Sequence, residues 1–202
     1  TVDALRRLNV EVTTAALNWK RAVGAHGMEL SVDASLGEAC MGDYDAVVLP
    51  GGMPGAANLA ADEQVADVLK RAAERGAVIA APTDTVYGVM CRYDDSAAIA
   101  ALFAVKDRPL DKAIPVLIGD RSQLDLLVPP PLSPAADLLI GRFWPGPLTL
   151  VLPAQTGLPS ALTAGKATAG VRMPAHAGLC ALIRRSGPLA ATSANLSGAA
   201  EA

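Results

Sequence analysis

The chain has 202 residues, of which 51% are hydrophobic and 18% are charged, so it can form a packed core and is not a disordered chain. No apolar run approaches the roughly 18 residues needed to cross a bilayer, and the first residues lack the apolar stretch of a secretory signal. The 3 cysteines are scattered and no Cys-x-x-Cys pair occurs. We therefore expect a cytoplasmic protein without disulfides and without a metal-ligand set of its own.

The net charge of −3 is distributed unevenly. Residues 1–81 hold 7 Lys or Arg against 11 Asp or Glu, whereas residues 82–202 hold 10 against 9. The overall charge argues against a general nucleic-acid coat. The second part of the chain is the better place for an anionic ligand, because positive charge is in slight excess there.

Helices and strands are predicted to alternate along the chain. In the first part, apolar spacing predicts a helix over 2–8, strands over 10–12 and 45–50, a glycine loop over 51–55, a helix from Asp62 to Gly76 and a strand over 77–81. In the second part it predicts helices over 97–105, 133–143 and 176–185, and strands over 114–118, 148–152, 169–173 and 188–192. This order indicates an α/β fold with a mixed parallel/antiparallel twisted sheet.

The first part carries Val-Asp-Ala-Leu-Arg-Arg at 2–7, Tyr-Asp-Ala-Val-Val-Leu-Pro-Gly-Gly at 44–52 and Glu-Arg-Gly at 74–76. Over residues 1–81 it resembles the PfpI family, which implies a partial flavodoxin-like unit. That family's chemistry needs a nucleophilic cysteine on the turn after the strand that ends at Ala81. Here Pro82 follows, Cys91 comes too late, and the family's first strand would precede Thr1. A PfpI-like hydrolase or deglycase is therefore an alternative that lacks its nucleophile.

The second part carries five motifs. They are Pro-Thr-Asp-Thr-Val-Tyr-Gly at 82–88, Lys-Asp-Arg-Pro at 106–109, Phe-Trp-Pro-Gly-Pro-Leu-Thr at 143–149, Val-Arg-Met-Pro at 171–174 and Thr-Ser-Ala-Asn-Leu-Ser-Gly at 192–198. In their types and order they resemble the YrdC family, over about residues 62–202. The resemblance implies ATP-dependent formation of threonylcarbamoyl-AMP from L-threonine and bicarbonate or CO2, for threonylcarbamoyladenosine in tRNA. Other tRNA-modification proteins are the partners that it suggests.

Such a reaction gathers anionic groups, so it calls for fixed cations rather than a covalent nucleophile. Lys106 and Arg108 are the expected catalytic residues. The resemblance maps Lys106, Arg108, Ser193 and Asn195 onto contacts with the nucleotide and its phosphates, and Thr83, Thr85 and Tyr87 onto the pocket for threonine and nucleotide. The expected substrate contacts also include Lys112, Thr149, Arg172 and His176. Mg²⁺ would be held mainly by phosphate oxygens and water.

Each candidate residue has a plainer alternative. The three cations Lys106, Arg108 and Lys112 suit a solvated helix face, and Arg172 suits a structural salt bridge. Thr149 suits an ordinary strand position and His176 a helix N-terminus. Other pairs also have plain readings: Gly51–Gly52 as a tight turn, Asp94–Asp95 as a helix start, Phe143–Trp144 as core, and Cys91 and Cys180 as packing residues.

The two resemblances overlap at the helix and strand within 62–81. We expect a PfpI-like segment over 1–75 and a YrdC-like domain over 76–202, joined through this shared helix and strand. Members of the YrdC family continue past the last motif, so we expect the elements that close the sheet to be absent and activity to be impaired. A non-catalytic chimeric α/β domain is a further alternative.

Overall fold

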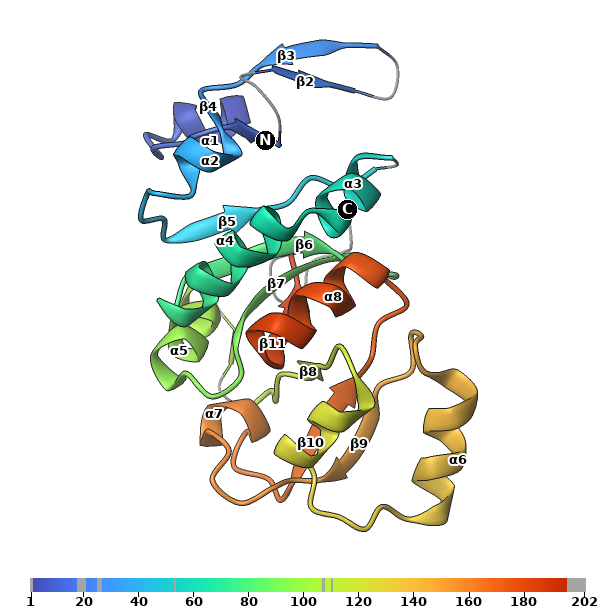
Figure 1. Ribbon diagram of the computed structural model, residues 1–202. Helices are drawn as coiled ribbons and strands as arrows, with labels where there is room; N and C mark the ends of the chain where they lie inside the picture. Colours follow the sequence, from blue (N-terminus) through green and yellow to red (C-terminus); the bar gives the residue numbers. More distant parts are fainter. Residues whose placement is uncertain are drawn as a thin grey trace.

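The computed structural model describes residues 2–17, 21–24, 27–52, 54–106, 108–109 and 111–195. Its centre is a seven-stranded sheet of order β5-β6-β7-β11-β8-β10-β9 (Figure 1). The strands are β5 (Ala46–Val48), β6 (Val78–Pro82), β7 (Tyr87–Arg92), β8 (Val116–Leu117), β9 (Leu150–Pro153), β10 (Thr168–Arg172) and β11 (Leu189–Ser193). The pairs β5–β6 and β8–β10 are parallel and the other neighbours antiparallel, which confirms the predicted mixed sheet.

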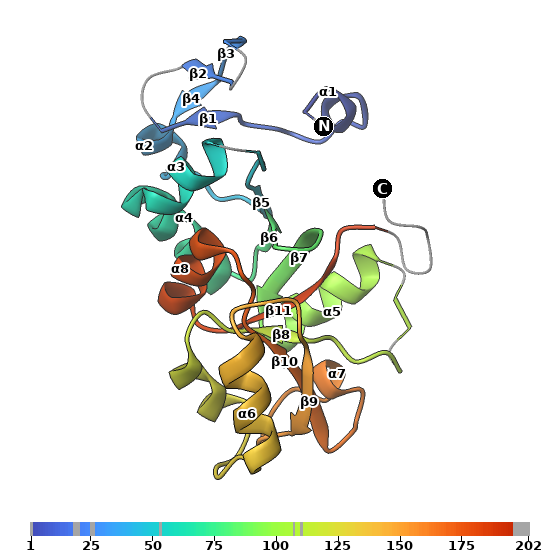
Figure 2. The same cartoon turned by 90° about the vertical axis from the view of Figure 1, so that its right-hand side faces the viewer.

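Helices cover both faces of this sheet. In Figure 2, α4 and α8 lie on one side, and α5 and α7 on the other. The helices of the second part and the shared helix are α4 (Glu63–Glu74), α5 (Ser96–Val105), the 3₁₀ helix η1 (Arg121–Leu126), α6 (Pro134–Phe143), α7 (Ser160–Thr163) and α8 (Ala177–Ser186). Neighbouring strand residues point to opposite faces. Met90 therefore joins the core under α4 and α8, while Cys91 joins the core under α5.

Side-chain caps fix where these helices begin. Asp62 accepts hydrogen bonds from two amides of the first turn of α4, at 2.9 and 3.2 Å, and Asp95 does the same for α5, at 2.9 and 3.0 Å. Ser133 caps α6, and Gly76, at a φ of +78°, follows the end of α4. These caps satisfy donors that a helix leaves unpaired. The predicted bounds of the three helices accordingly differ from the observed ones by only a residue or two.

The N-terminal part lies beyond β5, away from the seven-stranded sheet (Figure 1). Its elements are α1 (Val2–Arg7), β1 (Ala15–Ala16), β2 (Arg21–Val23), β3 (Glu29–Ser31), β4 (Ala34–Ser35) and α2 (Leu36–Ala39). Asp33 ties them together, since its carboxylate accepts hydrogen bonds of 2.7 Å from Arg6 and from the amide and hydroxyl of Thr14. The hydrogen bonds from Thr14, and then the charge of Arg6, lower the pKa of Asp33.

The first part also adds a strand to the main sheet and a helix against its cover. Strand β5 pairs in register with β6, Ala46 opposite Val78 and Val48 opposite Ala80. Helix α3 (Gly55–Ala61) packs on α8, where Gly178 lies so close to Ala60 that a Cβ on the glycine would overlap the Ala60 side chain. One continuous sheet therefore includes strands from both sides of the predicted junction.

Three sequence predictions differ from the structure. Residues 10–12 lie outside any strand, and the 114–118 strand is reduced to Val116 and Leu117. The continuous apolar run over 45–50 is typical of a buried strand, but β5 is a sheet edge and Val48 is 53% exposed. An edge strand has a neighbour on one side only, and this cannot be read from an apolar run.

Within the described residues, no helix combines the length and the apolar character needed to cross a bilayer.

Candidate functional site

Strand pairing brings the first and last motifs of the second part together. Pro82 lies opposite Tyr87 in the β6–β7 pair, and Gly88 lies opposite Ser193 in the β7–β11 pair. The Ala194 amide extends this ladder by donating to the Tyr87 carbonyl at 2.8 Å. The turn over 83–86 and the end of β11 therefore lie at the same end of the sheet.

Gly88 lies between these two motifs. A Cβ at this position would lie 3.5 Å from Thr83 Cγ2 and from the Thr192 carbonyl oxygen, which are ordinary contact distances, and 2.9 Å from Met90 Cε. A side chain at position 88 would therefore displace the end of the Met90 side chain.

Lys106 reaches this place from the far end of α5. It is the C-cap residue of the helix, is 5% exposed, and its ammonium group donates to the Ser193 carbonyl and, at 3.5 Å, to the Thr192 hydroxyl. Burial, and then the charge of Arg108, lower the pKa of Lys106. The structure thus joins the second motif to the last one through a buried cation.

Arg108 uses its hydrogen bonds locally. Its Nε donates to the Lys112 carbonyl at 3.2 Å and one Nη donates to the Ala113 carbonyl at 2.7 Å. The guanidinium also lies 6.0 Å from the centre of the Phe103 ring, a cation–π distance. Lys106 and Arg108 therefore make different contacts, although they are close enough for one charge to act on the other. The Lys112 side chain is exposed.

Arg172 forms the structural ion pair that was one of its two expected roles. Its partner is Asp84, which sequence analysis did not single out although it lies inside the 82–88 motif. Arg172 also donates to Thr85 Oγ1 at 3.3 Å. The turn is closed by Thr83, whose hydroxyl donates to the Val86 carbonyl at 2.7 Å. Thr192 was missed as well; only its place next to Ser193 could have indicated it.

The remaining candidate residues are Tyr87, Thr149, Asn195 and His176, and they make other contacts. Tyr87 is 41% exposed and its ring packs against Gly51 of the first part, where a Cβ would overlap the hydroxyl. Thr149 is exposed in the segment before β9, and Asn195 is half-buried after β11. His176 caps α8, because its Nδ1 accepts a hydrogen bond of 3.1 Å from the Leu179 amide.

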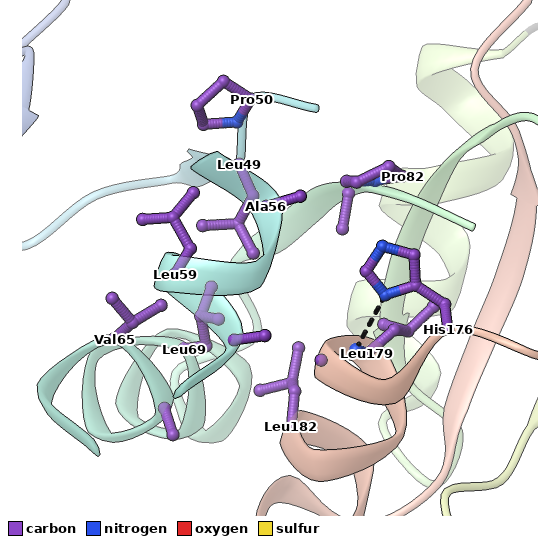
Figure 3. A pocket seen from close by; sticks show the side chains of 14 residues that line it. Leu49, Pro50, Ala56, Leu59, Val65, Leu69, Pro82, His176, Leu179 and Leu182 are labelled. Carbon is purple, nitrogen blue, oxygen red and sulfur yellow. Dashed lines mark hydrogen bonds between the residues drawn. The ribbon is translucent and has the colours of Figure 1, made fainter. Parts of the chain in front are cut away.

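A separate apolar pocket lies between the two parts of the chain. It is an open hollow of about 460 Å³ between α3, α4, α8 and the ends of β5 and β6, with the His176 imidazole beside Pro82 (Figure 3). Apart from His176, its lining is Leu49, Pro50, Ala56, Leu59, Ala60, Val65, Ala66, Leu69, Ala81, Pro82, Gly178, Leu179 and Leu182. Apart from His176, this lining has no polar side chain that could bind a phosphate. The charged cluster is therefore the candidate site for anionic substrates.

The buried thiols do not form a nucleophilic site. Burial, and then the charge of Asp95, raise the pKa of Cys91 to about 12, and burial raises the pKa of Cys180. A reactive thiol needs the opposite environment. The expected core role is confirmed for Trp144, which is buried and donates from Nε1 to the Leu148 carbonyl at 2.7 Å, but it is wrong for Phe143, which is 48% exposed.

Two family models match the chain, and their ranges overlap over residues 71–83. Residues 71–202 match the model of the Sua5/YciO/YrdC family, described as telomere recombination. Residues 1–83 match the model of the DJ-1/PfpI family. Both resemblances noted in the sequence are thereby confirmed.

Curated relatives match the second part. A threonylcarbamoyl-AMP synthase of Bacillus subtilis is 48% identical over 124 residues, which are 60% of this chain and 35% of the relative. The synthase of Pyrococcus abyssi is 44% identical over 124 residues, 61% of this chain and 36% of the relative. The chain thus spans about a third of the length of these two relatives.

Solved structures give the same fold. P. abyssi Sua5 complexed with L-threonine is 36% identical, with a TM-score of 0.66 over 77% of this chain and 43% of that protein. Escherichia coli YciO, at 22% identity and a TM-score of 0.61, covers 76% of this chain and 70% of its own. The YciO match concerns the fold alone.

Proposed function

Because the chain belongs to the Sua5/YciO/YrdC family through residues 71–202, we propose that it makes threonylcarbamoyl-AMP from L-threonine, bicarbonate or CO2, and ATP, as a step toward threonylcarbamoyladenosine in tRNA. One observation carries the proposal. The buried ammonium group of Lys106 donates to the Ser193 carbonyl and the Thr192 hydroxyl, at the end of the sheet where the turn over 83–86 also lies. A cation and short polar side chains are thus held together at one end of a sheet.

The proposed chemistry has two steps. The amine of L-threonine adds to CO2 and loses a proton, which gives a carbamate. A carbamate oxygen then attacks the α-phosphorus of ATP, the bond to the β-phosphate oxygen breaks, and pyrophosphate leaves. Neither step needs a covalent enzyme intermediate, so the protein contributes positioning and neutralisation of charge.

We assign Lys106 to the phosphates of ATP. In the structure its ammonium donates to a backbone carbonyl and a hydroxyl, and a phosphate oxygen is a stronger acceptor than either. Arg108 is close enough to add its charge, with Lys112 on the same loop. Ser193 is the last residue of β11 and Asn195 follows the strand, and both provide polar groups for the nucleotide.

We assign the threonine pocket to the turn over 83–86 and to Tyr87. The P. abyssi protein, whose structure is a complex with L-threonine, supports L-threonine as a substrate. Thr149 lies farther along the sheet, at the β9 side, and is kept as an outer contact. The hydrogen bond that His176 makes as a helix cap supports a structural role for it.

We propose that Mg²⁺ reaches the site on the triphosphate, held by phosphate oxygens and water. Over the part of the chain that the structure describes, no three His, Cys, Asp or Glu side chains gather as a metal site. Cys91 and Cys180 are buried as free thiols, which supports a reducing compartment such as the cytoplasm.

Pyrophosphate release from ATP tests the proposal. We expect release that depends on both L-threonine and bicarbonate. Lys106→Met should weaken ATP binding about 10- to 100-fold, because a charge-assisted contact contributes about 1.5–3 kcal/mol. Lys166→Ala, which removes an exposed lysine elsewhere, is the matched control and should bind ATP like the wild type. Absence of ATP binding in calorimetry would instead support a non-catalytic α/β domain.

A further inference from the structure

The guanidinium of Arg172 holds three segments together. Its Nε donates to the Gly146 carbonyl at 3.1 Å, one Nη donates to Thr85 Oγ1 at 3.3 Å, and the other Nη pairs with Asp84. Arg172 is the last residue of β10, and Gly146 lies in the segment between α6 and β9. Asp84 and Thr85 lie in the turn between β6 and β7. The three segments therefore meet at one side chain.

Burial makes each member of the pair depend on the other. The side chains of Arg172 and Asp84 are 13% and 12% exposed. A charge this deep is costly unless it is paired and hydrogen-bonded. Arginine suits the position because its planar donors point in fixed, separate directions, whereas a lysine is a single point charge. A Lys at 172 could keep the charge but not all three contacts.

The turn contains a directed chain of hydroxyl groups. Thr83 Oγ1 donates to the Val86 carbonyl at 2.7 Å and lies 3.1 Å from Thr85 Oγ1. A hydroxyl has one proton, so Thr83, which has given its own to Val86, accepts from Thr85. Thr85 in turn accepts from Arg172. The guanidinium thereby orients the Thr85 hydroxyl, while the Val86 carbonyl orients the Thr83 hydroxyl.

Backbone amides reinforce this arrangement. The amides of Thr85 and Val86 donate to Thr83 Oγ1 at 3.1 and 3.2 Å. Asp84 lies between the two threonines in sequence and is held by the ion pair. Loss of the pair would release the middle of the turn and, with it, these two amide bonds.

We propose that Asp84 and Arg172 are positioning residues, which act on the substrate by holding the turn over 83–86 and orienting the Thr85 hydroxyl. The inference rests on the proposed function, because that function assigns this turn to the threonine pocket. Arg172 then orients the turn without contacting the substrate, and it is not itself the cation that binds a substrate carboxylate or phosphate.

Steady-state kinetics with L-threonine tests the proposal. We expect Asp84→Asn and Arg172→Lys each to raise the KM for L-threonine about tenfold, the size expected for one or two lost hydrogen bonds, with kcat changed less than about threefold. The double variant should be no worse than either single one, since both break one network. If Arg172 binds the substrate directly, releasing it from Asp84 would leave the KM unchanged or lower, and that result overturns the proposal.

Amide hydrogen exchange provides a readout that does not need activity. We expect the amides of Thr85 and Val86 to exchange at least about tenfold faster in Asp84→Asn, in Arg172→Lys and in Thr85→Val than in the wild type. Thr85→Ser keeps the hydroxyl and should restore wild-type exchange and KM. Unchanged exchange in the folded variants overturns the proposal. Faster exchange in a chain that releases no pyrophosphate would remove the proposed function but leave the positioning role.

Discussion

Lys106 and Ser193 are 87 residues apart in the chain, and the Lys106 ammonium donates a hydrogen bond to the Ser193 carbonyl. The bond connects the end of α5 on one face of the sheet to the last residue of β11. Because Lys106 is 5% exposed, its charge is largely removed from water, and burial lowers its pKa from the ordinary 10.5. A buried lysine of this kind gives a measurable dependence on pH.

The first prediction concerns alkaline pH. ATP affinity should stay level from neutral pH upward and then fall as the pH rises through the lowered pKa of Lys106, because the neutral amine no longer attracts phosphate. In Lys106→Arg the fall should be absent over this range, since arginine keeps its charge. Calorimetric titrations at pH 7.5 to about 10 measure this. An equal fall in both proteins would assign the effect to another group.

Because of the same lysine, the stability of the folded chain should change with pH in the opposite direction to ATP affinity. Its pKa is lower in the folded state, so the unfolded chain binds more protons between the two pKa values. The free energy of unfolding should therefore rise with pH in this window relative to Lys106→Met. Urea unfolding at several pH values gives the difference, and parallel curves for the two proteins would contradict the prediction.

A second prediction concerns the contact between the two parts of the chain. Replacing a helical glycine by alanine normally adds up to about 1 kcal/mol of stability. At Gly178 we expect the reverse, a loss of about 1–3 kcal/mol, because the new methyl group overlaps Ala60. Gly141→Ala in α6 is the control, since its Cβ meets open space and should stabilise the chain. Urea unfolding measures both.

Ala60→Gly in the Gly178→Ala background should recover part of the loss, because it removes the group that is overlapped. Wild-type stability of Gly178→Ala alone would mean that α3 does not pack on α8 in solution.

A third prediction distinguishes the two roles of His176. As the cap of α8, it should cost about 1 kcal/mol when replaced by alanine, and Asn or Ser should restore most of this. The KM for L-threonine should be the same in His176→Asn as in the wild type. A raised KM in that stable variant would make His176 a substrate contact after all.

A fourth prediction concerns the thiols. In the folded protein, a disulfide reagent should react quickly with Cys40, which is half-exposed, and slowly with Cys91 and Cys180, which are buried. In denaturant all 3 cysteines should react. Cys40→Ser is the control and should abolish the fast phase. A second fast thiol would revive the PfpI-like hydrolase, whose chemistry requires a thiolate.

The positions of α4, α5 and α6 could be predicted because their signals are local, whereas α2, α3, η1 and α7 were not predicted. Asp62, Asp95 and Ser133 each cap the helix that follows, and Gly76 ends α4, so neighbouring residues settled these bounds. The strands were harder to predict from the sequence. Strand β7 was not predicted, because it begins with the last two residues of a motif, Tyr87 and Gly88, and because Met90 and Cys91 are buried on opposite faces of the sheet, which leaves no polar alternation. The two-residue strand β8 is defined by its partners β10 and β11, which lie far away in sequence.

The site could be predicted only as a set of residues. Motif order named Lys106, Ser193 and Thr85, but no spacing in the sequence shows that Lys106 reaches β11. The ion pair between Asp84 and Arg172 spans 88 residues and depends on the order of the strands. Long-range pairing is set by the whole fold, and sequence patterns report little of it.

Strand β5 determines what a cut between the two parts of the chain would expose. It covers the outer side of β6 through a parallel ladder, and the Leu49 amide extends the ladder by donating to the Ala80 carbonyl at 2.8 Å. A fragment cut just before β6 would expose that strand's free amides and carbonyls along an apolar edge, a common template for aggregation. Proteolysis or recombinant trimming where the two family matches meet, over residues 71–83, should therefore yield aggregation-prone fragments rather than two soluble domains.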